Sequence, residues 1–188
     1  MGVKMSRIGI FFAEGYEEIE ALTVVDLVRR AGLTIDMISV SGAGEVTGSH
    51  GITVKMDRTL SETDFSRMDM IVLPGGTAGT TGLENCGVLM DRLDEFYQSG
   101  DKYIAAVCAA PSIFGHRGYL KGRKATSYPT FESHLEGAVV TRAAAEVDGH
   151  IITGRGMGCS IPFGLAIVEQ FQGKNAADEL AEKIVYDR

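Results

Sequence analysis

The sequence has no tryptophan, and only 4 prolines and 3 cysteines occur among its 188 residues. Cys86, Cys108 and Cys159 are odd in number and irregularly spaced, and a chain of this length does not need disulfide bonds to fold. No apolar run approaches the roughly 18 residues that span a bilayer, and the N-terminus has no apolar signal-peptide block. We therefore expect free thiols in a cytoplasmic protein that makes no membrane contact.

Basic residues are also scarce, because 18 Lys and Arg stand against 25 Asp and Glu, which gives a formal net charge of -7. This charge repels a phosphate backbone, so we expect no nucleic-acid partner. Hydrophobic residues make up 45% of the chain and the 24 glycines far outnumber the prolines, which excludes intrinsic disorder and coiled coil. The length fits a single globular α/β domain over residues 1–188.

One short N-terminal pattern is typical of a lipid-anchored protein. Met1-Gly2 followed by Ser6 matches the loose template for N-myristoylation. However, the apolar run that begins at Ile8 indicates a buried first strand almost at once. We expect no lipid anchor.

Apolar runs of strand length alternate with segments of helical spacing along the chain. Strands are predicted at residues 8–12, 35–40, 70–73 and 103–107, a strand or hairpin near 52–56, a hairpin at 147–151, and helices at 17–31, 86–99, 111–116, 160–171 and 176–185. This alternation predicts a mostly parallel sheet with helices on both faces, and such sheets bind ligands at the carboxyl ends of their strands. The site should lie just after Phe12, Leu73 and Val107.

Cys108 is the strongest candidate for a catalytic residue. It stands where a buried strand ends and a helix begins, between Val107 and two alanines, which is the arrangement of a nucleophile elbow. The amides of the following helix would stabilise a thiolate there and lower the pKa of the thiol. The competing interpretation is a small buried hydrophobic residue. Cys159 also precedes a helix and is a second candidate, whereas Cys86 fits a packing role better.

Glu17, Glu18 and Glu20 all lie in the first turn of the predicted helix 17–31, where acids suit the helix dipole. Glu20 shares a helical stripe with Val24 and other apolar residues, so its carboxyl would be desolvated and would tend to stay protonated. The stripe of Glu18 fits a more solvated position with an ion pair.

The glycine and histidine patterns predict neither a phosphate-binding loop nor a metal site. Pro74-Gly75-Gly76-Thr77 follows a strand but lacks the Gly-Lys-Ser/Thr ending of a phosphate loop; the amide of Gly76 could instead approach an oxyanion beside Cys108. The four histidines show no metal-ligand spacing, so no metal site is predicted; they are His50, His116, His134 and His150.

Several segments, spread over nearly the whole chain, carry a family resemblance. They are Glu14-Gly15-Tyr16-Glu17-Glu18-Ile19-Glu20, Asp26-Leu27-Val28-Arg29-Arg30-Ala31-Gly32, Leu73-Pro74-Gly75-Gly76, Val107-Cys108-Ala109-Ala110-Pro111 and Thr153-Gly154-Arg155-Gly156. Together they resemble the ThiJ/PfpI family, specifically its DJ branch. The resemblance implies a flavodoxin-like three-layer sandwich of the class I glutamine amidotransferase type, usually a homodimer.

By the same resemblance, Cys108 is the reactive cysteine, Glu20 is a protonated acid hydrogen-bonded to its sulfur, and the amides of Gly76 and Ala109 are the oxyanion donors. Gly75, Tyr128 and Arg155 are expected to line the pocket. Ala109 stands where protease-like branches have a histidine, which disfavours peptidase activity. Tyr128 stands where some members have a pocket histidine, and Met157 and Pro162 also depart from common family residues.

Three hypotheses for the function follow. The first is a cofactor-free enzyme that uses Cys108 and Glu20 on α-oxoaldehydes such as methylglyoxal, like a glyoxalase III, or on glycated proteins, like a deglycase. The second is a redox sensor or stress chaperone switched by oxidation of Cys108. The third, an intracellular cysteine protease or amidase, needs a histidine near Cys108, for which His116 and His134 are the candidates.

Overall fold

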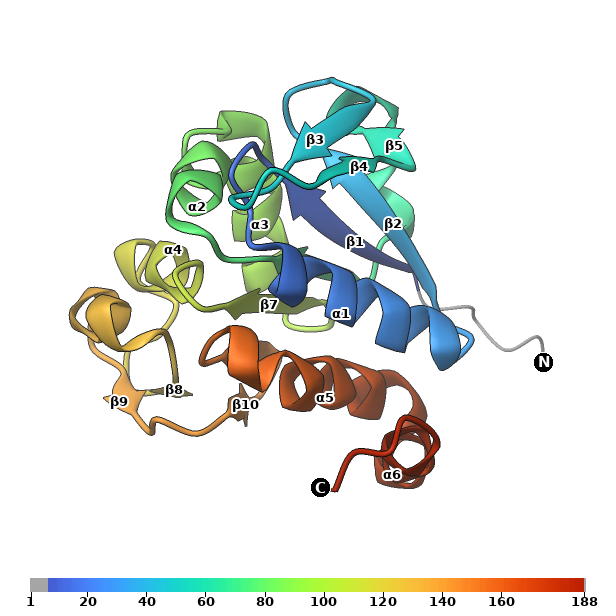
Figure 1. Cartoon of the computed structure of the whole chain (residues 1–188). Helices are drawn as coiled ribbons and strands as arrows, with labels where there is room; N and C mark the ends of the chain where they lie inside the picture. The colour runs from blue at the N-terminus through green and yellow to red at the C-terminus, as the bar shows by residue number, and fades with distance from the viewer. Residues whose placement is uncertain (1–6, 188) are drawn as a thin grey trace.

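The computed structural model describes residues 7–187, so the pattern of Met1, Gly2 and Ser6 lies outside the described residues. A seven-stranded sheet runs through the protein in the order β10-β11-β7-β6-β1-β2-β5 (Figure 1). All neighbours in it are parallel except β10 and β11. Its strands are β1 (Arg7–Phe12), β2 (Thr34–Ser39), β5 (Arg58–Thr59), β6 (Met70–Leu73), β7 (Tyr103–Val107), β10 (Ala145–Asp148) and β11 (Ile151–Gly154).

Helices cover both faces of this sheet, as predicted. Along β1, Ile10 and Phe12 belong to one core cluster and Phe11 to the other, because successive side chains of a strand point to opposite faces. The first cluster is covered by α1 (Glu18–Arg30), α5 (Ser160–Gln172) and α6 (Lys174–Lys183). The second is covered by α2 (Thr77–Glu84), α3 (Gly87–Ser99) and α4 (Pro111–His116). The fold is therefore a three-layer α/β sandwich with the flavodoxin-like architecture.

Shorter elements complete the chain. Two small two-stranded sheets form from β3 (Glu45–Thr47) with β4 (Thr53–Lys55) and from β8 (Lys124–Ala125) with β9 (Val139–Val140). Four 3-10 turns are described: η1 (Leu60–Glu62), η2 (Phe65–Arg67), η3 (Pro129–His134) and η4 (Met157–Cys159). None of the described helices is long and apolar enough to cross a membrane.

The predicted elements agree with the structure to within a few residues, but helix α2 and the short strands β5, β8 and β9 were not predicted. The hairpin prediction at 147–151 is confirmed, and Gly149 in its turn has φ 63°, a conformation that glycine adopts without strain. Helix α2 has a glycine- and threonine-rich sequence with weak apolar periodicity, so the sequence did not indicate it.

The central strands place the site. β1, β6 and β7 are adjacent and parallel, so Phe12, Leu73 and Val107 end at the same edge of the sheet. The loops after these strands start the segments that carry Glu20, Gly75 and Cys108. The predicted location at the carboxyl ends of these strands is therefore where those three residues are found.

The packing of α5 against the sheet gives a stability prediction. Phe163 is fully buried, and a Cβ built on Gly154 of β11 would lie 2.9 Å from its ring. Replacing Phe163 with Ala should lower the free energy of unfolding by about 3 to 5 kcal/mol, because it leaves a cavity in the core. Urea denaturation measures the change. Val88→Ala, at a residue 56% exposed, is the control and should change stability by less than about 0.5 kcal/mol; equal effects would contradict the packing argument.

Candidate active site

Cys108 lies on a sharp turn between β7 and α4. Its φ is 66°, a left-handed conformation that residues other than glycine rarely adopt. The turn is held by its neighbours, since the N–H of Cys108 donates to Gly154 O at 2.9 Å and its carbonyl accepts from Tyr128 N at 2.9 Å. The residue is 8% exposed. The structure therefore has the strained strand-to-helix turn that the sequence predicted.

Glu20 lies beside this cysteine, on the first turn of α1. It is fully buried, and its Oε2 accepts the N–H of Gly75 at 3.0 Å. Burial raises the pKa of its carboxyl to about 7, although hydrogen bonds with Cys108 and Gly75 oppose the rise and the charge of Glu17 adds to it. Glu20 is desolvated as predicted, and the raised pKa favours its protonated form.

Gly75 is the spacer between the acid and the thiol. A Cβ built on it would lie 2.3 Å from Glu20 Oε2 and 2.6 Å from Cys108 Cβ. Since real Cβ atoms do not approach so closely, only glycine lets its own amide, the carboxyl and the cysteine meet at this point. Gly75 is thus a contact residue of the site, as expected for a pocket residue.

Two further amides point to the sulfur. The N–H groups of Ala109 and Gly76 both lower the pKa of the Cys108 thiol through backbone hydrogen bonds. Gly76 has φ 86°, and a Cβ on it would lie 2.4 Å from Gly15 O, so a larger residue would displace this amide. The two expected oxyanion donors therefore sit at the thiol.

The prediction that the pKa of the Cys108 thiol is lowered is wrong, because all the surrounding groups together raise it. Burial raises the pKa of Cys108 most, the negative charge of Glu20 and its hydrogen bond raise it further, and the amides of Ala109 and Gly76 only partly offset the rise. The sequence showed the amides but not the enclosing side chains. A proton on Glu20 cancels its negative charge, so thiolate formation at Cys108 and protonation of Glu20 favour one another.

The other expected pocket residues lie around the turn. Tyr128 is 41% exposed, and its ring lies 3.3 Å from a Cβ built on Gly156. Arg155 directly follows Gly154, but its guanidinium donates to Arg142 O at 3.0 Å and so holds the segment before β10. The carbonyl of Gly154, which fixes the Cys108 backbone, was not singled out from the sequence, and only strand pairing identifies it.

Glu18 differs from its prediction. It is 5% exposed rather than solvated, and its two carboxylate oxygens accept from the backbone N–H of His50 at 2.7 Å and pair with its Nδ1 at 3.0 Å. Burial alone would raise the pKa of Glu18, but these bonds lower it to about 2. The β3–β4 hairpin folds over α1 and supplies His50, which local sequence cannot show.

Together, Glu17, Glu18 and His50 form the one group of three described side chains whose donor atoms, all within 4.8 Å of one another, could hold a metal ion. Ser49 Oγ lies 3.2 Å from a carboxylate oxygen of each glutamate. Both carboxylates therefore already accept hydrogen bonds from the loop of the β3–β4 hairpin.

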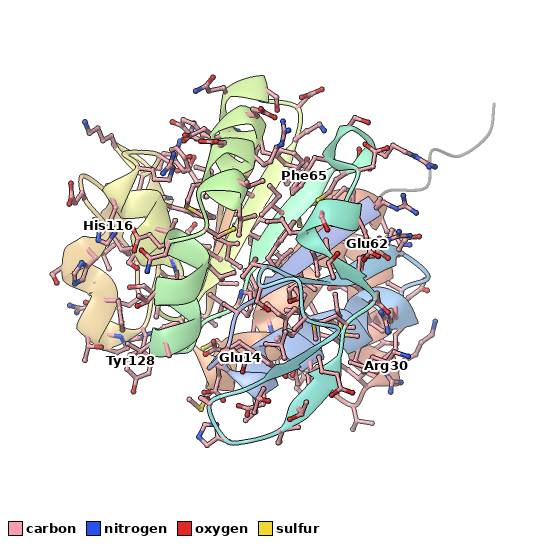
Figure 2. The ribbon with its side chains drawn as sticks, turned by 90° about the horizontal axis from the view of Figure 1, so that it is seen from above. Glu14, Arg30, Glu62, Phe65, His116 and Tyr128 are labelled. Atoms are coloured by element: carbon pink, nitrogen blue, oxygen red, sulfur yellow. The ribbon has the colours of Figure 1, made fainter. Side chains whose placement is uncertain are left out.

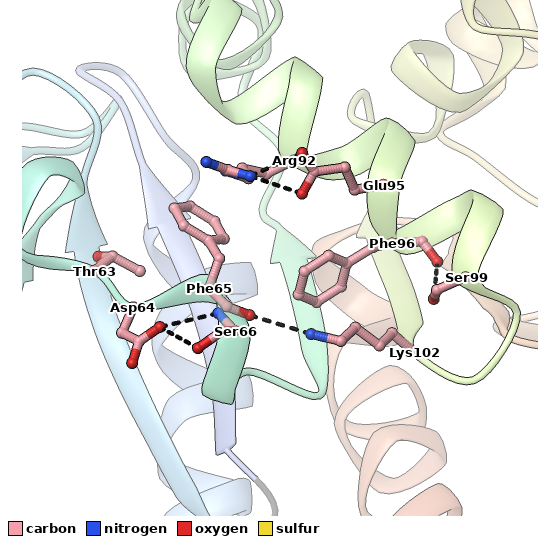
Figure 3. Close-up of a pocket in the computed structure, with 9 residues that line it drawn as sticks. All are labelled: Thr63, Asp64, Phe65, Ser66, Arg92, Glu95, Phe96, Ser99 and Lys102. Carbon is pink, nitrogen blue, oxygen red and sulfur yellow. Dashed lines mark hydrogen bonds and ion pairs between the residues drawn. The ribbon is translucent and has the colours of Figure 1, made fainter.

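The remaining cysteines and a cleft beside α3 lie away from these residues. Cys86 and Cys159 are free, partly exposed, and precede α3 and α5. A cavity of about 480 Å³ lies between η2 and α3, and Lys102 Nζ lies 4.4 Å from the centre of the Phe96 ring in it. Its lining side chains are drawn in Figure 3. It is lined by Thr63, Asp64, Phe65, Ser66, Arg92, Glu95, Phe96, Ser99 and Lys102, none of which is a site residue.

Comparisons with known proteins show which family this chain resembles. Residues 6–170 match the DJ-1/PfpI family. The chain is 36% identical over 187 residues to Protein DJ-1 homolog B of Arabidopsis thaliana, covering 98% of this chain but 42% of that protein. It is 32% identical to Protein dj-1beta of Drosophila melanogaster, covering 94% of this chain and 95% of that one. The structure of oxidized Toxoplasma gondii DJ-1 superposes with a TM-score of 0.90 at 31% identity, covering 97% and 100% of the two chains.

The raised pKa of Glu20 predicts how stability depends on pH. The folded-state pKa of about 7 exceeds the ordinary 4.5, so the contribution of Glu20 is fully present below pH 4.5 and is lost as the pH rises towards 7. The rise corresponds to about 3 kcal/mol. Glu18, with its lowered pKa of about 2, acts only below pH 4.5, outside this window.

Urea denaturation between about pH 4.5 and pH 8 measures this effect in the wild type and in Glu20→Gln, which keeps the shape without the titration. The free energy of unfolding should fall more steeply with pH in the wild type than in the variant. Parallel curves would contradict a raised pKa at Glu20.

Proposed function

The chain belongs to the DJ-1/PfpI family, and from that membership and the geometry around Cys108 we propose a cofactor-free enzyme that acts on small α-oxoaldehydes. Methylglyoxal is the simplest such substrate, and adducts of these aldehydes with protein thiols and amines are the larger ones. The observation that carries the proposal is a buried thiol that meets two backbone amides and a carboxyl group whose pKa is raised to about 7.

The first step of the proposed reaction is addition of the thiolate. The Cys108 sulfur forms a bond to the aldehyde carbon, and the electron pair of the C=O bond moves to the oxygen. The amides of Gly76 and Ala109 hold this oxyanion until it takes a proton. Protonated Glu20 supports the step because its neutral form adds no negative charge beside the sulfur.

The second step moves hydrogen within the substrate. Glu20 shuttles a proton from the former aldehyde carbon to the neighbouring carbonyl carbon, so the first carbon is oxidised while the second is reduced. The result is a thioester of a 2-hydroxy acid on Cys108. Water hydrolyses this thioester, releases the hydroxy acid and restores the thiol, so no external oxidant or reductant is needed.

Adducts of these aldehydes fit the same chemistry. A hemithioacetal or aminocarbinol on a protein side chain carries the aldehyde carbon in masked form. Transfer of that carbon to Cys108 would free the protein thiol or amine, and the rearrangement would then give the same hydroxy acid. Tyr128, partly exposed near the turn, would shape the entrance that such a substrate must pass.

A redox sensor or stress chaperone is the second candidate. A thiolate at Cys108 would react with two molecules of peroxide to give a sulfinate and two molecules of water. Protonated Glu20 and the amides of Gly76 and Ala109 could each donate a hydrogen bond to the sulfinate oxygens. The relative from Toxoplasma gondii is described in an oxidized form, which supports this alternative.

A cysteine protease or amidase is less well supported. Its candidate bases, His116 and His134, are hydrogen-bonded to each other. No histidine is among the groups that shift the pKa of Cys108. The homodimer implied by the family also stays a proposal, which sedimentation at micromolar concentration tests. The same holds for the cytoplasmic location.

Replacing Cys108 with Ser should abolish formation of the hydroxy acid from methylglyoxal, because a hydroxyl is a far poorer nucleophile at neutral pH. Glu20→Gln should lower kcat by about 10² to 10⁴, since the amide cannot shuttle a proton. Chromatographic detection of lactate measures both. Cys159→Ser is the matched control and should keep full activity. Turnover by Cys108→Ser, or loss of turnover in Cys159→Ser alone, would overturn the proposed role of Cys108.

Limited peroxide treatment separates sensing from catalysis. The redox alternative predicts that Cys108 gains two oxygen atoms before Cys86 and Cys159 react, although these two thiols are more exposed. Peptide mass spectrometry locates the added oxygen. Selective oxidation without aldehyde turnover would favour the sensor, and oxidation spread over all three cysteines would contradict it.

A further inference from the structure

Two histidines that are far apart in the sequence meet at the ends of two short helical segments. His116 is the last residue of α4 and His134 the last residue of η3. His116 Nε2 lies 3.0 Å from His134 Nδ1, and the ring planes are inclined by 73°. The sequence predicted no metal site because the two residues lack metal-ligand spacing, so this pair is a product of the fold alone.

A carboxylate fixes the tautomer of the first histidine. His116 Nδ1 lies 2.7 Å from Oε1 of Glu84, the last residue of α2. Because a carboxylate only accepts hydrogen bonds, Nδ1 carries the proton and the lone pair of Nε2 is left facing His134. Histidines that bind metals in proteins usually donate their other N–H to a carboxylate in this manner, which orients the ring and makes it a better ligand.

The backbone holds the two rings at this distance. A Cβ built on Gly115 would lie 1.9 Å from His134 O, so α4 and η3 are in direct backbone contact. Two Zn–N bonds of 2.0–2.1 Å at a tetrahedral angle need the nitrogens about 3.3 Å apart. The observed 3.0 Å requires only a small opening when an ion replaces the shared proton.

Solvent can complete the coordination of an ion at this place. The side chains of His116 and Glu84 are 35% and 37% exposed, and His134 is exposed as well. Imidazole pairs select zinc, nickel and copper over magnesium and calcium, which prefer oxygen ligands. The donor set therefore defines the class of ion.

We propose that His116 and His134 form a two-histidine site for a divalent first-row transition ion such as Zn²⁺, with Glu84 orienting His116. The ion replaces the one proton shared by the two rings, and water fills its remaining positions. This site is separate from the glutamate and histidine cluster of the hairpin, whose carboxylates are already hydrogen-bonded.

The position of the pair gives the ion a structural effect. Segment α4 starts three residues after Cys108, and η3 starts directly after Tyr128. Both segments therefore begin at the candidate active site and end at the histidine pair, and His116 and Tyr128 lie toward the same side of the molecule in Figure 2. An ion bound to both rings fastens the far ends of these segments to each other.

Calorimetric titration of the full chain with Zn²⁺, after removal of metal by a chelator, tests the proposal. The wild type should bind one ion at the pair. His134→Asn should lose this binding, because an amide does not ligate zinc as imidazole does. Asparagine is chosen because its amide nitrogen can still donate a hydrogen bond to His116 Nε2. Glu84→Gln should bind about tenfold more weakly. Saturating Zn²⁺ should raise the Tm of the wild type by several degrees and leave that of His134→Asn unchanged.

Two controls identify the competing ligands. Cys108→Ser and His50→Ala should each retain the zinc binding that His134→Asn loses. If the wild type binds no ion, if His134→Asn binds as tightly as the wild type, or if either control abolishes binding, the proposal is overturned. A zinc anomalous-scattering peak between the two rings in crystals of the wild type supports it without any substitution, and a peak at His50 contradicts it.

Discussion

A carboxyl group enclosed in the protein, with its pKa raised to about 7, is the constraint on which the candidate site depends. Glu20 has no contact with solvent, and a charge there is costly unless a partner compensates for it. The thiol of Cys108 is hydrogen-bonded to this carboxyl, and its own ionisation is opposed by burial and by a negative Glu20. An ionised Glu20 therefore keeps the proton on the sulfur, and a thiolate at Cys108 is favoured only beside a protonated Glu20.

The fold maintains this pair through close backbone contacts. The turn at Cys108 has a strained φ, which persists because its N–H and carbonyl are bonded to Gly154 and Tyr128. Gly75 and Gly76 bring their amides to the site only because they have no side chains. The strand order also matters. Because β1, β6 and β7 are neighbours, the segments that follow them lie together at one edge of the sheet.

Two buried glutamates near this edge, Glu18 and Glu20, differ in the groups that hydrogen-bond to their carboxyl oxygens. Glu18 is buried yet ionised, because the backbone and ring of His50 compensate for its charge. Glu20 is buried and its pKa is raised to about 7, because burial outweighs the one backbone N–H that it accepts and its hydrogen bond with Cys108. The pKa values of two acids two residues apart on one helix are thus shifted in opposite directions, because the loop of the β3–β4 hairpin supplies hydrogen bonds to Glu18.

The sequence by itself determined the alternation of strands and helices, the edge of the sheet where the site lies, the elbow at Cys108 and the apolar stripe of Glu20. These features follow from local patterns, which a chain carries wherever it folds. Only the tertiary structure decided that Glu18 is buried, that the thiol pKa is raised and that His116 meets His134. Burial and electrostatics sum over every neighbouring segment, and those neighbours come from distant parts of the chain.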